Sequence, residues 1–65
     1  MQTYQQRVID EKTELDEKIT KLRAFFTNPI YAYATLPIEE QERMDKQLQY
    51  MISYSEVLEE RIAAF

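Results

Sequence analysis

No residue in this 65-residue chain is glycine, and that absence limits the folds open to it. Tight β-hairpin turns and phosphate-cradling loops generally use glycine, because glycine adopts positive φ angles without a steric penalty. Glycine-rich nucleotide-binding loops of the Walker and dinucleotide types are therefore excluded. Glycine is also the usual residue just beyond a helix, so any helix in this chain has to end by other means.

The chain also has no cysteine and no histidine. A domain of this length buries only about 60% of its unfolded surface, so such chains usually depend on disulfides, metals or oligomerisation. Disulfides and thiolate metal sites are excluded, and the commonest metal ligand and neutral-pH general base is missing. We expect no cofactor and no metal, which leaves oligomerisation as the means of stabilisation.

The chain is acidic, with twelve Asp and Glu residues, eight Lys and Arg residues and a net charge of −4. Surfaces that bind DNA or RNA are normally basic, so we expect no nucleic-acid polymer as a partner. No apolar run approaches the roughly 18–20 residues of a transmembrane helix. Residues 1–7 lack the apolar core of a signal peptide. We therefore expect no membrane association and a cytoplasmic location.

Residues 2–26 have the spacing of one amphipathic helix. Steps of seven, four, three and four keep the apolar residues on one face. These residues are Val8, Leu15, Ile19, Leu22 and Phe26. Glu11 and Lys12 interrupt the stripe, so its middle turn is either polar within the core or solvent-facing.

Residues 37–64 predict a second helix, and residues 27–36 form the connection. Pro37 suits the first turn of this helix, and Glu39 and Glu40 suit its positive end. The apolar spacing is that of a coiled-coil seam, with the small Ser55 in register between its members. The seam residues are Met44, Leu48, Met51, Leu58, Ile62 and Phe65.

Two helices of about 25–28 residues with a short connection predict a single domain of the all-α class, an antiparallel hairpin. A lone hairpin covers only one side of each apolar stripe. A further stripe on the second helix, formed by Tyr50, Tyr54 and Val57, then lacks cover. We therefore predict a homo-oligomer in which helices of different chains complete the core along the stripes of both helices.

Side chains that could perform catalysis are few. Ser53 and Ser55 are the candidate nucleophiles, but the chain offers no histidine to activate them and no S-x-x-K motif. We interpret them as small residues that let helices approach closely. The many acidic residues are interpreted as solvated faces. We therefore predict that the protein is not an enzyme.

Aromatic residues gather around the connection, and two interpretations of them stay open. They are Phe25, Phe26, Tyr31 and Tyr33. Tyrosine can stack on a nucleobase and also donate a hydrogen bond, and basic residues of the first helix could reach phosphates. Those basic residues are Arg7, Lys18, Lys21 and Arg23. The residues alone favour the simpler interpretation, in which the aromatic rings plug the hairpin end and the oligomer seam.

Two stretches cover nearly the whole chain and carry a family resemblance. They are TYQQRVIDEKTELDEKITKLRAFF and LPIEEQERMDKQLQYMISYSEVLEERIAAF. Three motifs are the specific part, T-Y-Q-x-R-V, L-P-x-E-E-Q and Y-S-E-V-L-x-x-R-I-A. In these the chain resembles the small crAss-like-phage-related hairpin proteins, although residues 30–34 form a longer and more aromatic insertion.

The second half, residues 36–63, is also similar to the helical hairpin of the anti-CBASS and anti-Thoeris sponges. Those phage proteins form oligomers that sequester cyclic nucleotide immune signals without cleaving them. The resemblance implies a phage counter-defence protein in the infected host cell, with ligand pockets between subunits. The sponges carry a tyrosine-containing N-terminal arm that this chain lacks. By position, the ligand-binding residues would be Tyr4, Arg7, Arg23, Tyr31, Tyr33 and Thr35.

Two alternative functions stay open. Residues 37–64 contain seven acids and three bases, so the protein could be a small acidic interaction protein that docks on a host protein and inhibits it. It could also be a structural helical accessory protein without a ligand.

Overall fold

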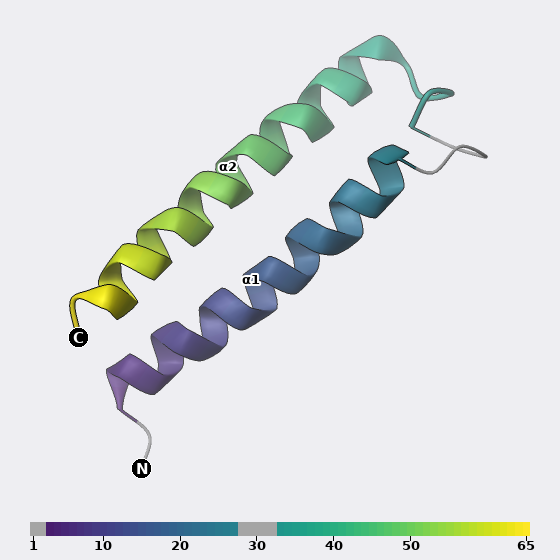
Figure 1. The fold of residues 1–65 in the computed structure, drawn as a ribbon. Helices are drawn as coiled ribbons and strands as arrows, with labels where there is room; N and C mark the ends of the chain where they lie inside the picture. Colours follow the sequence, from purple (N-terminus) through teal and green to yellow (C-terminus); the bar gives the residue numbers. More distant parts are fainter. Residues whose placement is uncertain (1–2, 28–32) are drawn as a thin grey trace.

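The structure is a computed structural model that describes residues 3–27 and 33–65. It contains two helices, α1 (Tyr4–Thr27) and α2 (Ile38–Ala63), and no strand among the described residues. The helices form an antiparallel hairpin, with the start of α1 and the end of α2 on one side and the end of α1 and the start of α2 on the other (Figure 1). The hairpin measures 46 × 18 × 14 Å. The predicted all-α hairpin is therefore confirmed.

A threonine cap defines the start of α1. The backbone N–H of Gln6 donates to Thr3 Oγ1 at 3.3 Å, and the N–H of Arg7 donates to the Thr3 carbonyl at 3.2 Å. A threonine side chain in this position satisfies one of the free N–H groups of the first turn. The helix therefore begins at Tyr4, two residues later than the predicted start, and ends at Thr27.

The start of α2 depends on the Leu36-Pro37 segment. Pro37 precedes the helix, and its carbonyl accepts hydrogen bonds from the N–H groups of Glu40 and Gln41 at 2.9 and 3.1 Å. The Gln41 side chain donates back to the Leu36 carbonyl at 3.0 Å. The prediction put Pro37 inside the first turn, and the structure has it one residue earlier. The helix ends at Ala63, and no described residue has a positive φ, as expected for a chain without glycine.

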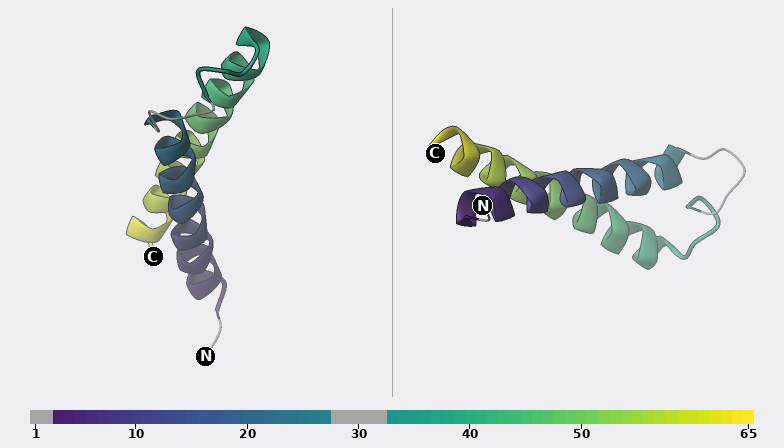
Figure 2. Two further views of the ribbon diagram at one scale, coloured as in Figure 1. Left: turned by 90° about the vertical axis from the view of Figure 1, so that its right-hand side faces the viewer. Right: turned by 90° about the horizontal axis from the view of Figure 1, so that it is seen from below.

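The core of the hairpin is small. Among the described residues four apolar side chains are buried, Val8, Leu15 and Ile19 of α1 and Leu58 of α2. Partly buried side chains of α2 pack against them, namely Leu48, Met51, Ile52 and Ile62. The two helices cross at an angle, so they do not stay equally close along their length (Figure 2). The remaining predicted seam residues Leu22, Phe26 and Met44 are half-buried.

Aromatic contacts lie at both ends of the hairpin. At the chain termini, the Tyr4 and Phe65 rings meet edge to face with centroids 5.7 Å apart. Phe65 follows the last turn of α2 and is 42% exposed, so within one chain it does not join the core as predicted for the seam. Near the connection, the Phe26 and Tyr33 rings pack with centroids 4.6 Å apart.

Much apolar surface remains uncovered within one chain. The large exposed apolar side chains are Tyr4, Ile9, Ile38, Tyr50, Tyr54, Val57 and Phe65. The predicted uncovered stripe of Tyr50, Tyr54 and Val57 is among them, and the homo-oligomer stays a prediction. Neither described helix has the long apolar stretch that crossing a membrane requires.

Candidate functional site

A polar cluster joins the two helices in the middle of their seam. Lys12 Nζ donates to Asp16 Oδ2 at 2.8 Å and to Ser55 Oγ of α2 at 3.1 Å. The Ser55 hydroxyl in turn donates to Asp16 Oδ1 at 2.5 Å. Ser55 is buried, while about half of the Asp16 side chain stays exposed. Of the two residues that interrupt the apolar stripe, Lys12 is therefore polar within the seam and Glu11 faces solvent.

The charges of this cluster stabilise each other. The hydrogen bond from Lys12, and next that from Ser55, lowers the pKa of Asp16 against an opposing effect of burial. The hydrogen bond to Asp16 raises the pKa of Lys12, and Glu59 of α2 adds a weaker attraction. A lysine acts as a general base only when its pKa is lowered, so this lysine is not prepared to activate Ser55.

The ligand-binding residues predicted from the resemblance do not come together within one chain. Tyr4 and Arg7 are exposed and lie near the termini, where the Tyr4 ring contacts the Phe65 ring. Tyr33 contacts Phe26 near the end of α1 and Thr35 precedes α2, so both lie at the other end of the 46 Å hairpin. Tyr31 lies outside the described residues. A pocket that uses both ends would need residues of more than one chain, so the predicted site stays a prediction.

Tyr33, Arg23 and Thr35 have different surroundings. Tyr33 is half-buried against Phe26, and its hydroxyl donates to the Gln41 carbonyl at 3.3 Å. Arg23 is exposed on α1 and lines a hollow of ≈ 260 Å³ together with acidic residues of α2. Thr35 is exposed beside the start of α2. The Tyr33 ring therefore packs the hairpin end, as the simpler interpretation of the aromatic cluster proposed.

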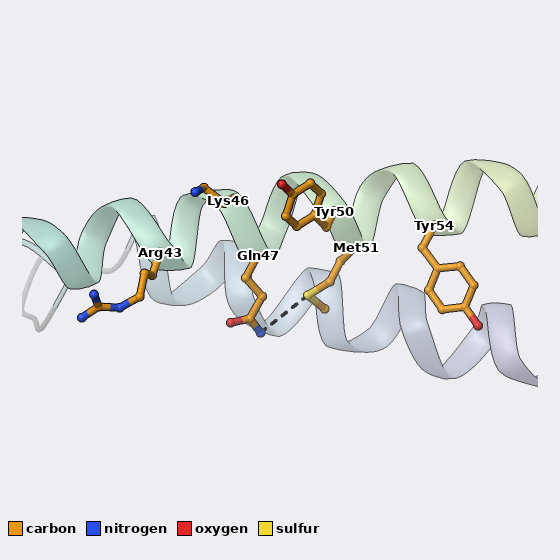
Figure 3. Close-up of a pocket in the computed structure, with 6 residues that line it drawn as sticks. All are labelled: Arg43, Lys46, Gln47, Tyr50, Met51 and Tyr54. Atoms are coloured by element: carbon orange, nitrogen blue, oxygen red, sulfur yellow. Dashed lines mark hydrogen bonds between the residues drawn. The ribbon is translucent and has the colours of Figure 1, made fainter.

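A larger open groove lies along α2, with a volume of ≈ 400 Å³. Figure 3 shows its six lining side chains spaced along the helix. They are Arg43, Lys46, Gln47, Tyr50, Met51 and Tyr54. Gln47 Nε2 lies 3.9 Å from the Met51 sulfur and ties the floor of the groove together. Two cations and two tyrosines thus share one surface of a helix that is acidic overall.

A second groove of ≈ 360 Å³ lies between the helices and shares Gln47 and Met51 with the first. Its other lining residues come from α1 and are Lys18, Lys21, Leu22 and Phe25. The two grooves therefore adjoin at these two side chains. We call the surface formed by Lys18, Lys21, Phe25, Arg43, Lys46, Tyr50 and Tyr54 the cationic–aromatic face.

Another side of the seam carries the opposite charge. There the hollow that includes Arg23 is lined by the acidic residues Asp16, Glu56 and Glu59. We call these three residues and their surroundings the acidic side. Among the residues that the structure describes, no three acidic side chains converge in a way that could hold a metal ion. The hairpin therefore presents two surfaces of unlike charge.

The sequence contained part of the signal for the cationic–aromatic face. It showed the Tyr50 and Tyr54 stripe and noted Lys18 and Lys21 as possible phosphate ligands. It did not join them to Arg43 and Lys46, because that requires knowing how α1 is rotated against α2. The spacing of three and four residues from Lys46 back to Arg43 and on to Tyr50 was the available sign of a shared helix face.

The fold and these surfaces define a small all-α hairpin protein whose exposed aromatic and charged side chains lie on its helices. By sequence, the chain matches the Sequestin family over residues 2–64 and belongs to that family. No curated protein and no solved structure matches the chain. The family name is consistent with a sequestering protein, as in the resemblance to the cyclic-nucleotide sponges. It does not support the resemblance to the crAss-like-phage-related proteins.

Proposed function

We propose that this chain is a non-enzymatic phage counter-defence protein that binds a cyclic nucleotide immune signal of the host cell and withholds it from its receptor. Membership of the Sequestin family over residues 2–64 carries the proposal. The resemblance of residues 36–63 to the sponge hairpin supplies the class of ligand. Exposed tyrosines and cations on one face of the hairpin supply groups that suit a nucleotide.

Sequestration needs tight binding without turnover. Aromatic rings can stack on the bases, while lysine and arginine side chains bind the phosphates. The only interhelical serine cluster among the described residues supports the absence of catalysis, because Lys12 is held protonated by Asp16. A protonated lysine cannot take the proton of Ser55, so no activated nucleophile results.

Pockets between subunits belong to the proposal. Among the described residues of one chain, four apolar side chains are buried, whereas Ile9, Val57 and Phe65 stay exposed. Burying them between copies would stabilise a chain of this size. Light scattering or analytical ultracentrifugation at micromolar concentration measures the mass, and a fully folded monomer would contradict this part of the proposal.

The binding experiment is calorimetry against cyclic dinucleotides, cyclic trinucleotides and cyclic ADP-ribose isomers. We expect one class to bind with a fixed stoichiometry per subunit, and the ligand to be recovered chemically unchanged after heat release from the protein. Absence of binding to every member at tens of micromolar would remove the proposal. Recovery of a cleaved product would show an enzyme instead.

A second candidate function rests on the acidic side. Glu56 and Glu59 are exposed there, and Glu60 follows them on α2. Such a surface could dock on a basic groove of a host protein and inhibit it. A pull-down that recovers one stoichiometric host protein, and loses it when these three residues are changed to lysine, would favour this function over sequestration.

A further inference from the structure

We infer that the cationic–aromatic face is the surface that contacts the nucleotide, with bases against Tyr50 and Tyr54 and phosphates between the basic residues of α1 and α2. The inference rests on the proposed function and adds the residues that perform it. They differ from those predicted near the chain ends and the connection.

The basic residues of this face are available for an anion. Within the described part of the chain, Lys18, Lys21 and Lys46 form no ion pair, although acidic residues lie one turn away. Arg43 is paired with Glu40 at 2.9 Å, but both side chains are exposed, and exposed pairs of this kind contribute little. A ligand with more than one phosphate matches basic residues distributed in this way.

The rings of the face are also available. Tyr50 is 68% exposed and Tyr54 is 45% exposed. Neither ring contacts another ring among the described residues, in contrast to Tyr4 and Tyr33. Exposed aromatic side chains beside cations form the usual combination for holding a base and its phosphate without reading sequence.

A single small ligand can reach groups of both helices. Packed helices lie about 8–10 Å apart, and the two grooves meet at Gln47 and Met51. A nucleotide with two phosphates could lie across this floor, with one phosphate toward the lysines of α1 and the other toward Arg43 and Lys46. Phe25 lines the α1 side of the same floor.

Charge favours such an anion over a second copy of the chain in a symmetric contact. A two-fold contact places the same patch on both partners, so each copy would bring its basic residues against those of the other. That arrangement is repulsive unless an anion lies between them. Contact of this face with the acidic side of another copy is the remaining arrangement, and the experiment separates it.

The test compares two double variants that remove the same charge. Arg43→Gln with Lys46→Gln changes the cationic–aromatic face. Arg7→Gln with Arg23→Gln changes the residues predicted from the resemblance. We expect the first pair to weaken the best-binding cyclic nucleotide at least about tenfold and the second pair to change its affinity less than about threefold. The reverse order would overturn the inference.

The aromatic part is tested by Tyr50→Ala with Tyr54→Ala, compared with Tyr4→Ala. Circular dichroism and light scattering check that helix content and mass are kept. We expect the first variant to lose affinity at least about tenfold at unchanged mass. Loss of assembly together with the ligand would show that these rings form an interface between copies, and would overturn the inference.

Nuclear magnetic resonance separates failure of the site from failure of the proposed function. Cyclic di-AMP, AMP and inorganic phosphate are titrated to millimolar concentration and backbone amide shifts are followed. Shifts by both nucleotides around residues 43–54 and 18–25, without a similar effect of phosphate, support the face even where calorimetry detects no tight binding. Tight binding whose shifts lie elsewhere would refute the face while leaving sequestration intact. No localised shift in any titration would refute the face.

Discussion

The part of the hairpin near the chain termini and the part near the connection contain similar apolar residues but bury them to different depths. Near the termini, residues 4–19 and 52–65 include all four buried apolar side chains. Near the connection, residues 20–27 and 33–51 have no buried apolar side chain, and the half-buried ones are Leu22, Phe25, Phe26, Leu36, Met44, Leu48 and Met51. The same helical spacing therefore identifies a face without determining how deeply that face is buried.

Side-chain size explains this difference. In the terminal part, the buried Ser55 lies in register between Met51 and Leu58, and so small a residue lets the helices approach. In the connection part, the half-buried Phe26 ring packs on Tyr33. Because the helices cross at an angle, close approach in one part leaves the other part more open (Figure 2). The open part is where the two grooves of the cationic–aromatic face meet.

The largest expected effect comes from a matched pair of leucines. Leu58 has no exposed surface, so Leu58→Ala should lower the free energy of unfolding by about 2–5 kcal/mol. Leu48 is half-buried, so Leu48→Ala should cost about 1–2 kcal/mol. Urea unfolding followed by circular dichroism gives both values.

Milder variants and the dependence on protein concentration complete the comparison of Leu58 with Leu48. If Leu58→Ala does not fold, the milder Leu58→Met and Leu48→Met pair preserves volume and should show the same order at smaller size. Equal losses of unfolding free energy in the Leu58 and Leu48 variants at low protein concentration would contradict the difference in burial between the two parts. A Leu48 cost that grows with protein concentration would show that another copy covers the connection part.

The pattern of residues was sufficient to predict the two helices and the place of Ser55 in the seam, but not the contacts between helices. Spacing and capping are local, so the stripe of α1 and the acidic first turn of α2 could be read from the sequence. Lys12 meets Ser55 across 43 residues, and nothing in a one-dimensional pattern chooses that partner. The sequence left Lys12 as either polar in the core or solvent-facing for this reason.

The candidate site shows the same limit. Lys21 and Lys46 are on different helices, and their common face depends on the rotation of α1 against α2. Tyr4 and Arg7, named by analogy with an N-terminal arm, lie in the first turn of α1, where Tyr4 contacts Phe65. The packing of Tyr33 could be predicted, because Phe26 lies close to it in the sequence and belongs to the same aromatic cluster.

The next prediction concerns the buried hydroxyl of the terminal part. Ser55→Ala removes a hydrogen bond to Asp16 and one from Lys12, and should cost about 1 kcal/mol of unfolding free energy. Ser53→Ala is the matched control, because Ser53 is exposed two residues away on the same helix. Both changes alter helix propensity equally, so their difference in urea midpoint isolates the cluster. A control that costs as much as Ser55→Ala would sink this account.

The cluster also predicts a pH dependence of stability. The pKa of Asp16 is lowered by its bonds to Lys12 and Ser55, so its contribution is present above the unfolded value of about 3.9 and is lost as pH falls through the folded pKa. The pKa of Lys12 is raised, so its contribution is present below about 10.4 and is lost as pH rises further. Glu59 of α2 is the other charged group that acts on Lys12.

Thermal unfolding at pH 7 and pH 3 checks the acid arm. Asp16→Asn should reduce the difference in melting temperature between the two pH values, because the side chain no longer titrates. Glu14→Gln removes the same charge from an exposed position of α1 and should keep most of the difference. An unchanged pH dependence in Asp16→Asn would assign the acid sensitivity to other carboxylates.

The smallest expected effect lies in the connection part, at Tyr33. Tyr33→Phe removes the 3.3 Å hydrogen bond to the Gln41 carbonyl and keeps the ring contact with Phe26, so unfolding free energy should fall by less than about 0.5 kcal/mol. Tyr33→Ala also removes the ring contact and the buried area of a half-buried ring, so it should cost more than Tyr33→Phe. Urea unfolding measures both, and calorimetry with the best-binding nucleotide measures affinity in the same variants.

If the rings at this end only pack the hairpin, affinity should stay within about threefold in Tyr33→Phe. A tenfold loss of affinity at unchanged stability would instead return the ligand to the connection, as predicted from the resemblance, and would count against a separate nucleotide face on α2.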